Sequence, residues 1–281
     1  MDKLLLVDGS NLLFQMFFGM PARIVNRSGR AIHGTMGFVG ALLKIIRMTE
    51  PTHIAVLFDG EHENARTELN AEYKANRIDY SEVSESESPF SQLPDIYSAL
   101  DFLKIKHAET FDCETDDWIA AYVHTYKKDA KIIISSFDSD YFQLLSENVS
   151  VLRYRGVKTA ICTPAYLFEQ FGIMPSQYAD FKSLVGDTAD NIKGAEKVGP
   201  KTAACLLNEF FSLDGVIENA KKIDKPSIRA SILRDAERLR TNYRLIKLEG
   251  GAKLPFSLEE LENGGISMTT AETLKNIGLL P

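Results

Sequence analysis

The sequence has 281 residues, of which 44% are hydrophobic and 25% charged, and its formal net charge is -7. This composition is typical of a globular protein with two modest domains or one large one, and it argues against a disordered chain. No apolar run is long enough to cross a bilayer, and Leu4–Val7 is too short for a signal-peptide core. Cys113, Cys162 and Cys205 are widely spaced, so we expect reduced thiols and a cytoplasmic protein.

The first two-thirds of the chain alternate buried-strand and helix patterns. The predicted strands are Lys3–Val7, His53–Phe58, Lys131–Ile134 and Val149–Tyr154. The predicted helices between them include Phe38–Met48, Pro94–Leu103 and Asp116–Tyr126. Continuous apolar strands separated by helices indicate an α/β fold, with a mostly parallel sheet that helices cover on both faces.

The last third of the chain has a different character. Strand patterns vanish from about Phe181 onward, and short helices follow, among them Lys201–Phe211 and Ser227–Leu239. We therefore expect an α/β domain over residues 1–182 and a helical domain over residues 183–281.

The charge is unevenly distributed between these two parts. The first holds 18 Lys and Arg against 25 Asp and Glu, whereas the second holds 14 of each. Within the second part, Lys221–Leu248 holds nine basic and three acidic residues. Such a run is usually a solvated helix face, although a basic stretch can also bind nucleic acid in a salt-sensitive way.

Acidic residues follow three of the predicted strands. Asp8, Asp59 and Asp138 end apolar runs, and Asp140 lies two residues further on. Because the carboxyl ends of parallel strands form the ligand crevice of an open sheet, we expect these side chains at one edge. A single Asp at such a place is more often a turn or helix-cap residue. Three at equivalent places repel one another unless cations neutralise them.

Two further acidic groups join this pattern. Glu114, Asp116 and Asp117 precede a predicted helix, where acids also favour the helix dipole. Asp187 and Asp190 lie in a turn that enters the helical part and could form an Asx turn. Ligand sets made only of oxygen select hard cations such as Mg²⁺ or Mn²⁺ rather than zinc. So many carboxylates indicate two or more ions, an arrangement that serves phosphodiester hydrolysis.

Six motifs occur in order along the chain: LLLVDGSNLL, AVLFD, ARTELNAEYKANR, CETDD, SSFDSDYFQLL and LVGDTADNIKGAEKVGPKTA. This ordered set resembles the FEN-type 5′ nucleases, such as the 5′→3′ exonuclease domain of bacterial DNA polymerase I and flap endonuclease. The resemblance implies a PIN-like sheet domain with a helical arch over about residues 66–95, followed by a helix-hairpin-helix region. It implies a structure-specific 5′ nuclease, acting as a 5′→3′ exonuclease or 5′-flap endonuclease in DNA replication and repair. The polar, acidic stretch Ile78–Pro89 predicts a mobile or partly helical protrusion within the arch.

The resemblance also implies roles for individual residues. The metal ligands would be Asp8, Asp59, Glu114 and Asp116 in a first cluster, and Asp117, Asp138, Asp140, Asp187 and Asp190 in a second. Lys74 and Arg77, at the base of the arch, would contact the scissile phosphate and stabilise developing negative charge. Lys74 could equally be a phosphate-positioning residue. Arg66 and Tyr73 belong to the same motif and would bind DNA.

The segment GAEKVGPKTA resembles the helix-hairpin-helix element of the family. The implied DNA-binding residues are Lys193, Lys197, Gly199, Lys201 and Thr202. Gly199 would let the backbone approach a phosphate at the start of a helix. The family's hairpin holds a monovalent cation such as K⁺ through backbone carbonyls. Relatives usually have glycine at the position of Lys197 and proline at that of Lys193, which leaves this ion open.

We expect a monomer whose partner is DNA with 5′ flaps or 5′ ends, RNA-primed ends included, and no membrane association. No polymerase domain follows Pro281, so we expect a stand-alone nuclease. Two alternatives stay open, a catalytically weak protein that binds branched DNA and a PIN-type ribonuclease. The hairpin and the YKANR segment favour DNA, and a metal-titrated cleavage assay would separate an enzyme from a binding protein.

Overall fold

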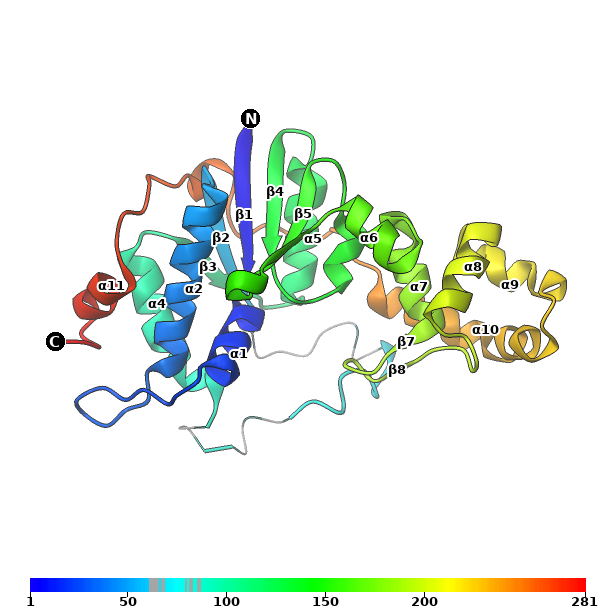
Figure 1. Cartoon of the computed structure of the whole chain (residues 1–281), viewed down its shortest axis with the longest axis horizontal. Helices are drawn as coiled ribbons and strands as arrows, with labels where there is room; N and C mark the ends of the chain where they lie inside the picture. Colours follow the sequence, from blue (N-terminus) through cyan, green and yellow to red (C-terminus); the bar gives the residue numbers. More distant parts are fainter. Residues whose placement is uncertain (61–65, 67–68, 79, 81–82, 85–86) are drawn as a thin grey trace.

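A computed structural model gives the fold of the protein (Figure 1). The larger part of the molecule is a sheet flanked by helices, and a helical extension projects from one side of it. The N-terminus begins the sheet, and the C-terminus lies beside the flanking helix α11 (Thr270–Asn276). The predicted acidic protrusion is described only in part, because some of its residues lie outside the described ranges. These ranges are 1–60, 66, 69–78, 80, 83–84 and 87–281.

The central sheet has six strands in the order β3-β2-β1-β4-β5-β6. Strands β1 to β5 run parallel, and β6 pairs antiparallel with β5, which confirms the predicted mostly parallel sheet. The strands are β1 (Asp2–Asp8), β2 (His53–Phe58), β3 (Lys106–Glu109), β4 (Ala130–Ser135), β5 (Val149–Arg153) and β6 (Ala160–Cys162). The short outer strands β3 and β6 carry too few apolar residues to stand out in the sequence.

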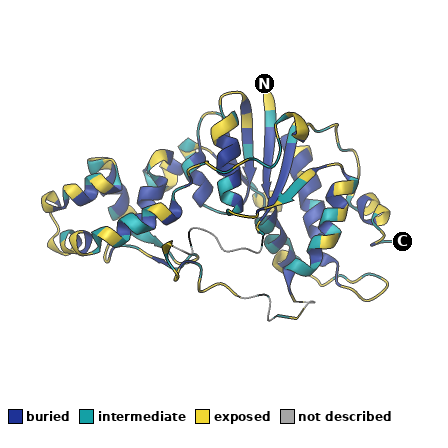
Figure 2. Cartoon of the chain, turned by 180° about the vertical axis from the view of Figure 1, so that it is seen from behind, coloured by how far each residue is buried: buried dark blue, intermediate teal, exposed yellow. Residues whose placement is uncertain are grey.

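Helices cover both faces of the sheet. They are α1 (Gly9–Gly19), α2 (His33–Thr49), α4 (Leu93–Phe102) and α5 (Thr115–Tyr126). Leu4 and Leu6 of β1 pack in one apolar cluster with α5, and Leu5 and Val7 pack in another with α1, α2 and α4. All four side chains are fully buried, as are most strand residues in Figure 2. A strand covered on both faces needs apolar residues at every position, which explains the continuous runs in the sequence.

The helical extension follows the sheet. Its helices are α6 (Pro164–Phe171), α7 (Tyr178–Val185), α8 (Pro200–Phe210), α9 (Leu213–Glu218) and α10 (Pro226–Ile246). The long helix α10 packs against α7 and α9. A two-residue antiparallel pair, β7 (Gly186–Asp187) with β8 (Ile192–Lys193), joins α7 to α8. The expectation that strands end before Phe181 is therefore wrong for this short turn.

After α10 the chain returns to the sheet. The Asn263 amide donates to the Thr52 carbonyl at 2.7 Å, and α11 (Thr270–Asn276) packs against α2 and α4. Six short 3₁₀ helices complete the described secondary structure: η2 (Pro89–Gln92), η3 (Asp140–Leu144), η4 (Gly156–Lys158), η5 (Pro175–Gln177), η6 (Ala220–Lys222) and η7 (Glu259–Leu261). Within the described residues, no helix has the length and apolar character to span a membrane. The division at residues 182 and 183 stays a prediction.

Candidate active site at the strand ends

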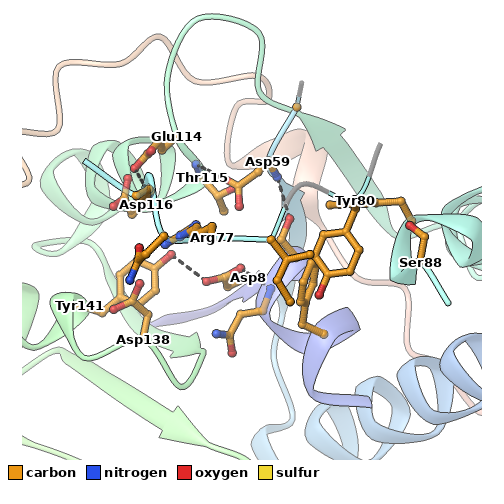
Figure 3. Close-up of a pocket in the computed structure, with 18 residues that line it drawn as sticks. Asp8, Asp59, Arg77, Tyr80, Ser88, Glu114, Thr115, Asp116, Asp138 and Tyr141 are labelled. Atoms are coloured by element: carbon orange, nitrogen blue, oxygen red, sulfur yellow. Dashed lines mark hydrogen bonds and ion pairs between the residues drawn. The ribbon is translucent and has the colours of Figure 1, made fainter. Parts of the chain in front are cut away.

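The carboxyl ends of β1, β2 and β4 meet at one edge of the sheet, where acidic side chains converge (Figure 3). Asp8 ends β1 and caps α1, and its Oδ1 accepts from the Asn11 amide at 2.9 Å. Its Oδ2 accepts from the Ser136 hydroxyl at 3.0 Å and from the Tyr141 hydroxyl at 3.1 Å. The side chain is 6% exposed, so these donors fix its orientation.

Asp59 and Asp138 follow β2 and β4 in the same way. The Thr115 amide, at the start of α5, donates to Asp59 Oδ1 at 2.9 Å. The Asp140 amide donates to Asp138 Oδ1 at 2.8 Å. In the part of the chain that the structure describes, no Lys or Arg forms an ion pair with these two carboxylates or with Asp8. Neutral donors therefore orient the three strand-end acids.

The acids at the start of α5 are held differently, by basic side chains of the arch motif. Arg66 pairs with Glu114, with Asp116 at 2.9 Å and with Asp117 at 2.7 Å. Lys74 Nζ lies 2.7 Å from Glu114 Oε2. Burial alone would raise the pKa of Glu114, but Lys74 and Arg66 outweigh it and lower that pKa to about 2. These cations occupy the carboxylates that the resemblance assigns to metal ions.

A second acidic group lies beside the first. Carboxylate oxygens of Asp140, Asp187 and Asp190 lie within 4.8 Å of one another. Lys182 of α7 pairs with Asp187 and lies 3.1 Å from Asp140. Arg77 pairs with Asp190 at 2.8 Å. The fold thus brings together acids from η3, β7 and the turn after β7, as the ordered motifs predict.

Two buried carboxyls have strongly shifted proton affinities. Burial and the charge of Asp59 raise the pKa of Asp8 to about 7. Burial and the charge of Asp138 raise the pKa of Asp140 to about 7. Such groups keep a proton near neutral pH unless a cation replaces it. With donors that are all oxygen, the site fits hard divalent ions.

A cleft of about 970 Å³ opens above the strand-end acids. Its lining includes Lys74 and Arg77 from the YKANR segment. On another part of its wall, the rings of Phe14, Tyr80 and Phe90 contact one another edge to face, with centroids 5.4 to 5.6 Å apart. The cleft therefore combines negative, positive and aromatic surfaces, which suits a nucleic-acid strand.

Comparison with known proteins agrees with this geometry. Residues 3–172 match the family described as 5'-3' exonuclease, N-terminal resolvase-like domain, and residues 173–269 match its C-terminal SAM fold. The chain belongs to the 5′-3′ exonuclease family.

Two relatives of this chain differ widely in length. DNA polymerase I of Streptococcus pneumoniae is 34% identical over 269 residues, which cover 94% of this chain and 30% of that relative. The 5'-3' exonuclease of Aquifex aeolicus is 31% identical over 264 residues, which cover 93% of this chain and 87% of that relative. The chain therefore spans about a third of the polymerase relatives and most of the Aquifex protein.

Solved structures share the fold of this chain. The T5 5'-exonuclease with bound divalent metal ions (zinc) matches with a TM-score of 0.72 at 22% identity, over 88% of this chain and 89% of that one. The catalytic core of Rad2 in complex with DNA substrate matches with a TM-score of 0.61 at 13% identity, over 100% of this chain and 89% of that one. At these identities the likeness shows the architecture alone.

The segment predicted to form the hairpin lies between β8 and α8. Gly199 is the N-cap of α8 in an extended conformation, with φ -90° and ψ 178°. Lys193, Lys197 and Lys201 are exposed, and Thr202 is half-buried. These residues lie along the surface segment that runs from β8 into the first turn of α8.

Two residues of the arch motif are less accessible than the sequence suggests. Tyr73 is 5% exposed, and its hydroxyl donates to Glu114 Oε2 at 3.2 Å. The Arg66 side chain is 11% exposed, because it lies among the acids. Both side chains contact the carboxylates from within the protein, and their predicted contact with DNA stays a prediction.

Three side chains that shape the site do not stand out in the sequence. Lys182 stands in a helical pattern that reads as a solvated face, although its side chain is only 12% exposed. Ser136 and Tyr141 flank the FDSD segment, and only the fold reveals that both donate to Asp8. Their closeness in sequence to Asp138 and Asp140 is the one available signal.

Proposed function

We propose that this chain is a structure-specific 5′ nuclease that hydrolyses DNA phosphodiester bonds near junctions of single-stranded and double-stranded DNA. One observation carries the proposal: carboxylates from three strand ends, from the start of α5 and from the β7 turn converge beside Lys74 and Arg77. A cluster of acids bordered by cations suits a polyanion that is bound and cut with the help of metal ions.

We assign Mg²⁺ or Mn²⁺, in two or more sites, to the nine acids. The first cluster holds Asp8, Asp59, Glu114 and Asp116. The second holds Asp117, Asp138, Asp140, Asp187 and Asp190. When bound there, divalent ions activate water and balance the charge that develops on the phosphate.

The chain's own residues position the reacting groups. Ser136 and Tyr141 hold Asp8, and the Thr115 amide holds Asp59. Lys74 and Arg77, which line the cleft beside Glu114 and Asp190, would bind the scissile phosphate and stabilise its developing charge. The exposed lysines of the hairpin hold the downstream duplex through its phosphates.

The substrate follows from the family and from the cleft. The bacteriophage T5 flap endonuclease, a structural neighbour, is described in a complex with DNA and metal ions. We infer that this chain takes DNA with 5′ flaps or 5′ ends, RNA-primed ends included. We also propose a monomer, and three free cysteines support a reducing, cytoplasmic setting.

Cleavage of a 5′-labelled flap duplex tests the proposal. The reaction is run in Mg²⁺ or in EDTA, with the wild type, Asp138→Ala and the control Asp129→Ala, which alters an exposed acid just before β4. We expect cuts near the junction only with metal, and only by the wild type and the control. Tight flap binding without any cleavage would leave a protein that binds branched DNA, and cleavage of RNA alone would indicate a PIN-type ribonuclease.

A further inference from the structure

Two consecutive backbone carbonyls at the entrance of the hairpin converge on one cationic side chain. Arg238 Nη1 donates to the Lys193 carbonyl and, at 3.1 Å, to the Gly194 carbonyl. The buried Asn242 side chain donates to the same Lys193 carbonyl at 2.9 Å. Carbonyl oxygens grouped in this way provide the coordination that proteins otherwise give to monovalent metal ions.

An ion-pair network fixes the Arg238 guanidinium. Asp235, three residues earlier on α10, lies 2.9 Å from Arg238 Nη2 and 2.9 Å from Arg234. Arg234 continues the chain of contacts to Glu196 on the hairpin itself, at 3.3 Å. Hydrogen bonds from Arg234 and then Arg238 lower the pKa of Asp235 to about 2, so its negative charge is present at neutral pH. Side chains of α10 therefore contact both the backbone of the hairpin, through Arg238, and a hairpin side chain, through the Arg234–Glu196 pair.

The hairpin is also pressed against α7. The Ala195 amide donates to the Leu184 carbonyl at 2.8 Å. A Cβ added to Gly194 would lie 2.2 Å from the carbonyl carbon of Val185, so only glycine fits at this crossing. Contacts with α7 on one side and with Arg238 on the other therefore fix the backbone where residues 194–199 lead into α8.

We propose that Arg238 is the resident cation of this hairpin and positions it for DNA in place of a bound K⁺. The two carbonyls at its entrance already have donors, and a guanidinium keeps its charge at any physiological pH. Lys197, which replaces the usual glycine of the family, adds positive charge to the same turn and disfavours a second cation. The K⁺ that the family resemblance implies therefore does not fit these residues.

This role of Arg238 rests on the proposed DNA-binding function and concerns the salt that flap binding needs. Flap binding by this protein does not depend on K⁺, because Arg238 holds the carbonyls in any salt. Arg244 on the same helix offers a matched control, since its guanidinium donates to Thr241 of its own helix at 3.2 Å and is exposed.

The experiment measures flap-duplex binding by fluorescence anisotropy, with Ca²⁺ replacing Mg²⁺ to suppress cleavage. The wild type, Arg238→Gln, Arg238→Lys and Arg244→Gln are compared in potassium chloride and in tetramethylammonium chloride at equal ionic strength. We expect equal wild-type affinity in both salts. Arg238→Gln should lose about tenfold in tetramethylammonium, the effect of one charge-assisted contact, with part of the loss recovered in K⁺. Arg238→Lys should retain most of the affinity, and Arg244→Gln should weaken binding slightly and equally in both salts.

Hydrogen exchange without DNA gives an independent readout. The amides of Ala195 and Val198 should exchange faster in Arg238→Gln than in Arg244→Gln, because the hairpin loses its cation. Wild-type binding that requires K⁺, or identical exchange in the two variants, would overturn the assignment. If no variant bound flap DNA, the proposed function would fail, and the exchange data would still decide the role of Arg238.

Discussion

The acidic cleft and the basic helix α10 achieve their charge arrangements by opposite means. In the cleft, the carboxyl groups of Asp8, Asp59 and Asp138 lie together because parallel strands end at one edge, and no Lys or Arg within the described residues forms an ion pair with them. On α10, the positive charges are largely paired, since Arg234 and Arg238 share Asp235. Acids without basic partners at the strand ends therefore indicate a metal site, whereas the paired arginines of the helix hold the backbone of the hairpin in place.

The contrast corrects a simple interpretation of the sequence. The basic stretch Lys221–Leu248 predicts a face for DNA, yet Arg240 pairs with Asp214 and Glu237, and Arg238 turns toward the hairpin carbonyls. The electrostatic attraction of DNA then depends on the exposed lysines of the hairpin, Lys193, Lys197 and Lys201, more than on the helix as a whole.

Asp59→Asn should have the largest effect. The amide oxygen can still accept from the Thr115 amide, so the fold is kept while a metal ligand loses its charge. We expect cleavage to fall by roughly a thousandfold or more, above the loss caused by removing one electrostatic donor. Single-turnover cleavage measures this, and flap affinity should change less than about twofold. Asp129→Asn, which alters an exposed acid near the opposite ends of the strands, is the control, and equal losses in both would show that the strand-end position of Asp59 has no special role in cleavage.

Lys74→Ala should lower single-turnover cleavage by about a hundredfold, because one phosphate-stabilising charge is lost. Metal affinity should hold or increase, since Lys74 no longer competes for Glu114. Lys104→Ala is a close control, because Lys104 is exposed and has the same left-handed φ of 57°. Weaker metal binding by Lys74→Ala would show that the lysine supports the metal site rather than the phosphate.

Metal affinity should depend on pH. Asp8 and Asp140 have pKa values of about 7, so bound protons compete with Mg²⁺ below neutrality. Apparent affinity should rise by about tenfold per pH unit for each displaced proton and level off above about pH 7.

The same two carboxyls bind more protons in the folded chain than in the unfolded one between about pH 4 and 7. The protein in EDTA should therefore lose stability as pH rises through this window. Thermal melts with EDTA or Mg²⁺ at several pH values measure both effects, and Asp8→Asn should flatten them.

Substitutions of two hairpin glycines should have the smallest effects, one on DNA binding and the other on the stability of the fold. A Cβ at Gly199 would meet no protein atom within 4 Å, whereas one at Gly194 would collide with Val185. Gly199→Ala should leave Tm unchanged and weaken flap binding severalfold, because the added methyl group meets only the phosphate. Gly194→Ala should lower the stability of the protein by about 1–3 kcal/mol. Unchanged flap affinity in Gly199→Ala would place the duplex elsewhere.

Those features of the site that depend on the order and direction of the strands could be predicted from the sequence. Strand ends are readable from apolar runs, so Asp8, Asp59 and Asp138 could be placed at one edge without coordinates. Side-chain pairing between distant elements could not be read in this way. Lys182 looks like a solvated helix residue until α7 packs beside η3. Arg238 looks like a DNA contact, although Asp235 three residues earlier was a local sign of pairing.

A phosphorothioate substitution tests most directly whether the strand-end carboxylates hold metal ions against the scissile phosphate. A flap substrate with sulfur in place of a nonbridging oxygen at the cut site is compared with the normal substrate, in Mg²⁺ and in Mn²⁺. Sulfur is a poor ligand for hard Mg²⁺ and a better one for Mn²⁺. We predict slow cleavage of the sulfur substrate in Mg²⁺ and recovery in Mn²⁺. Equal rates for both substrates in Mg²⁺, or an equal loss in both metals, would contradict direct metal contact with the phosphate.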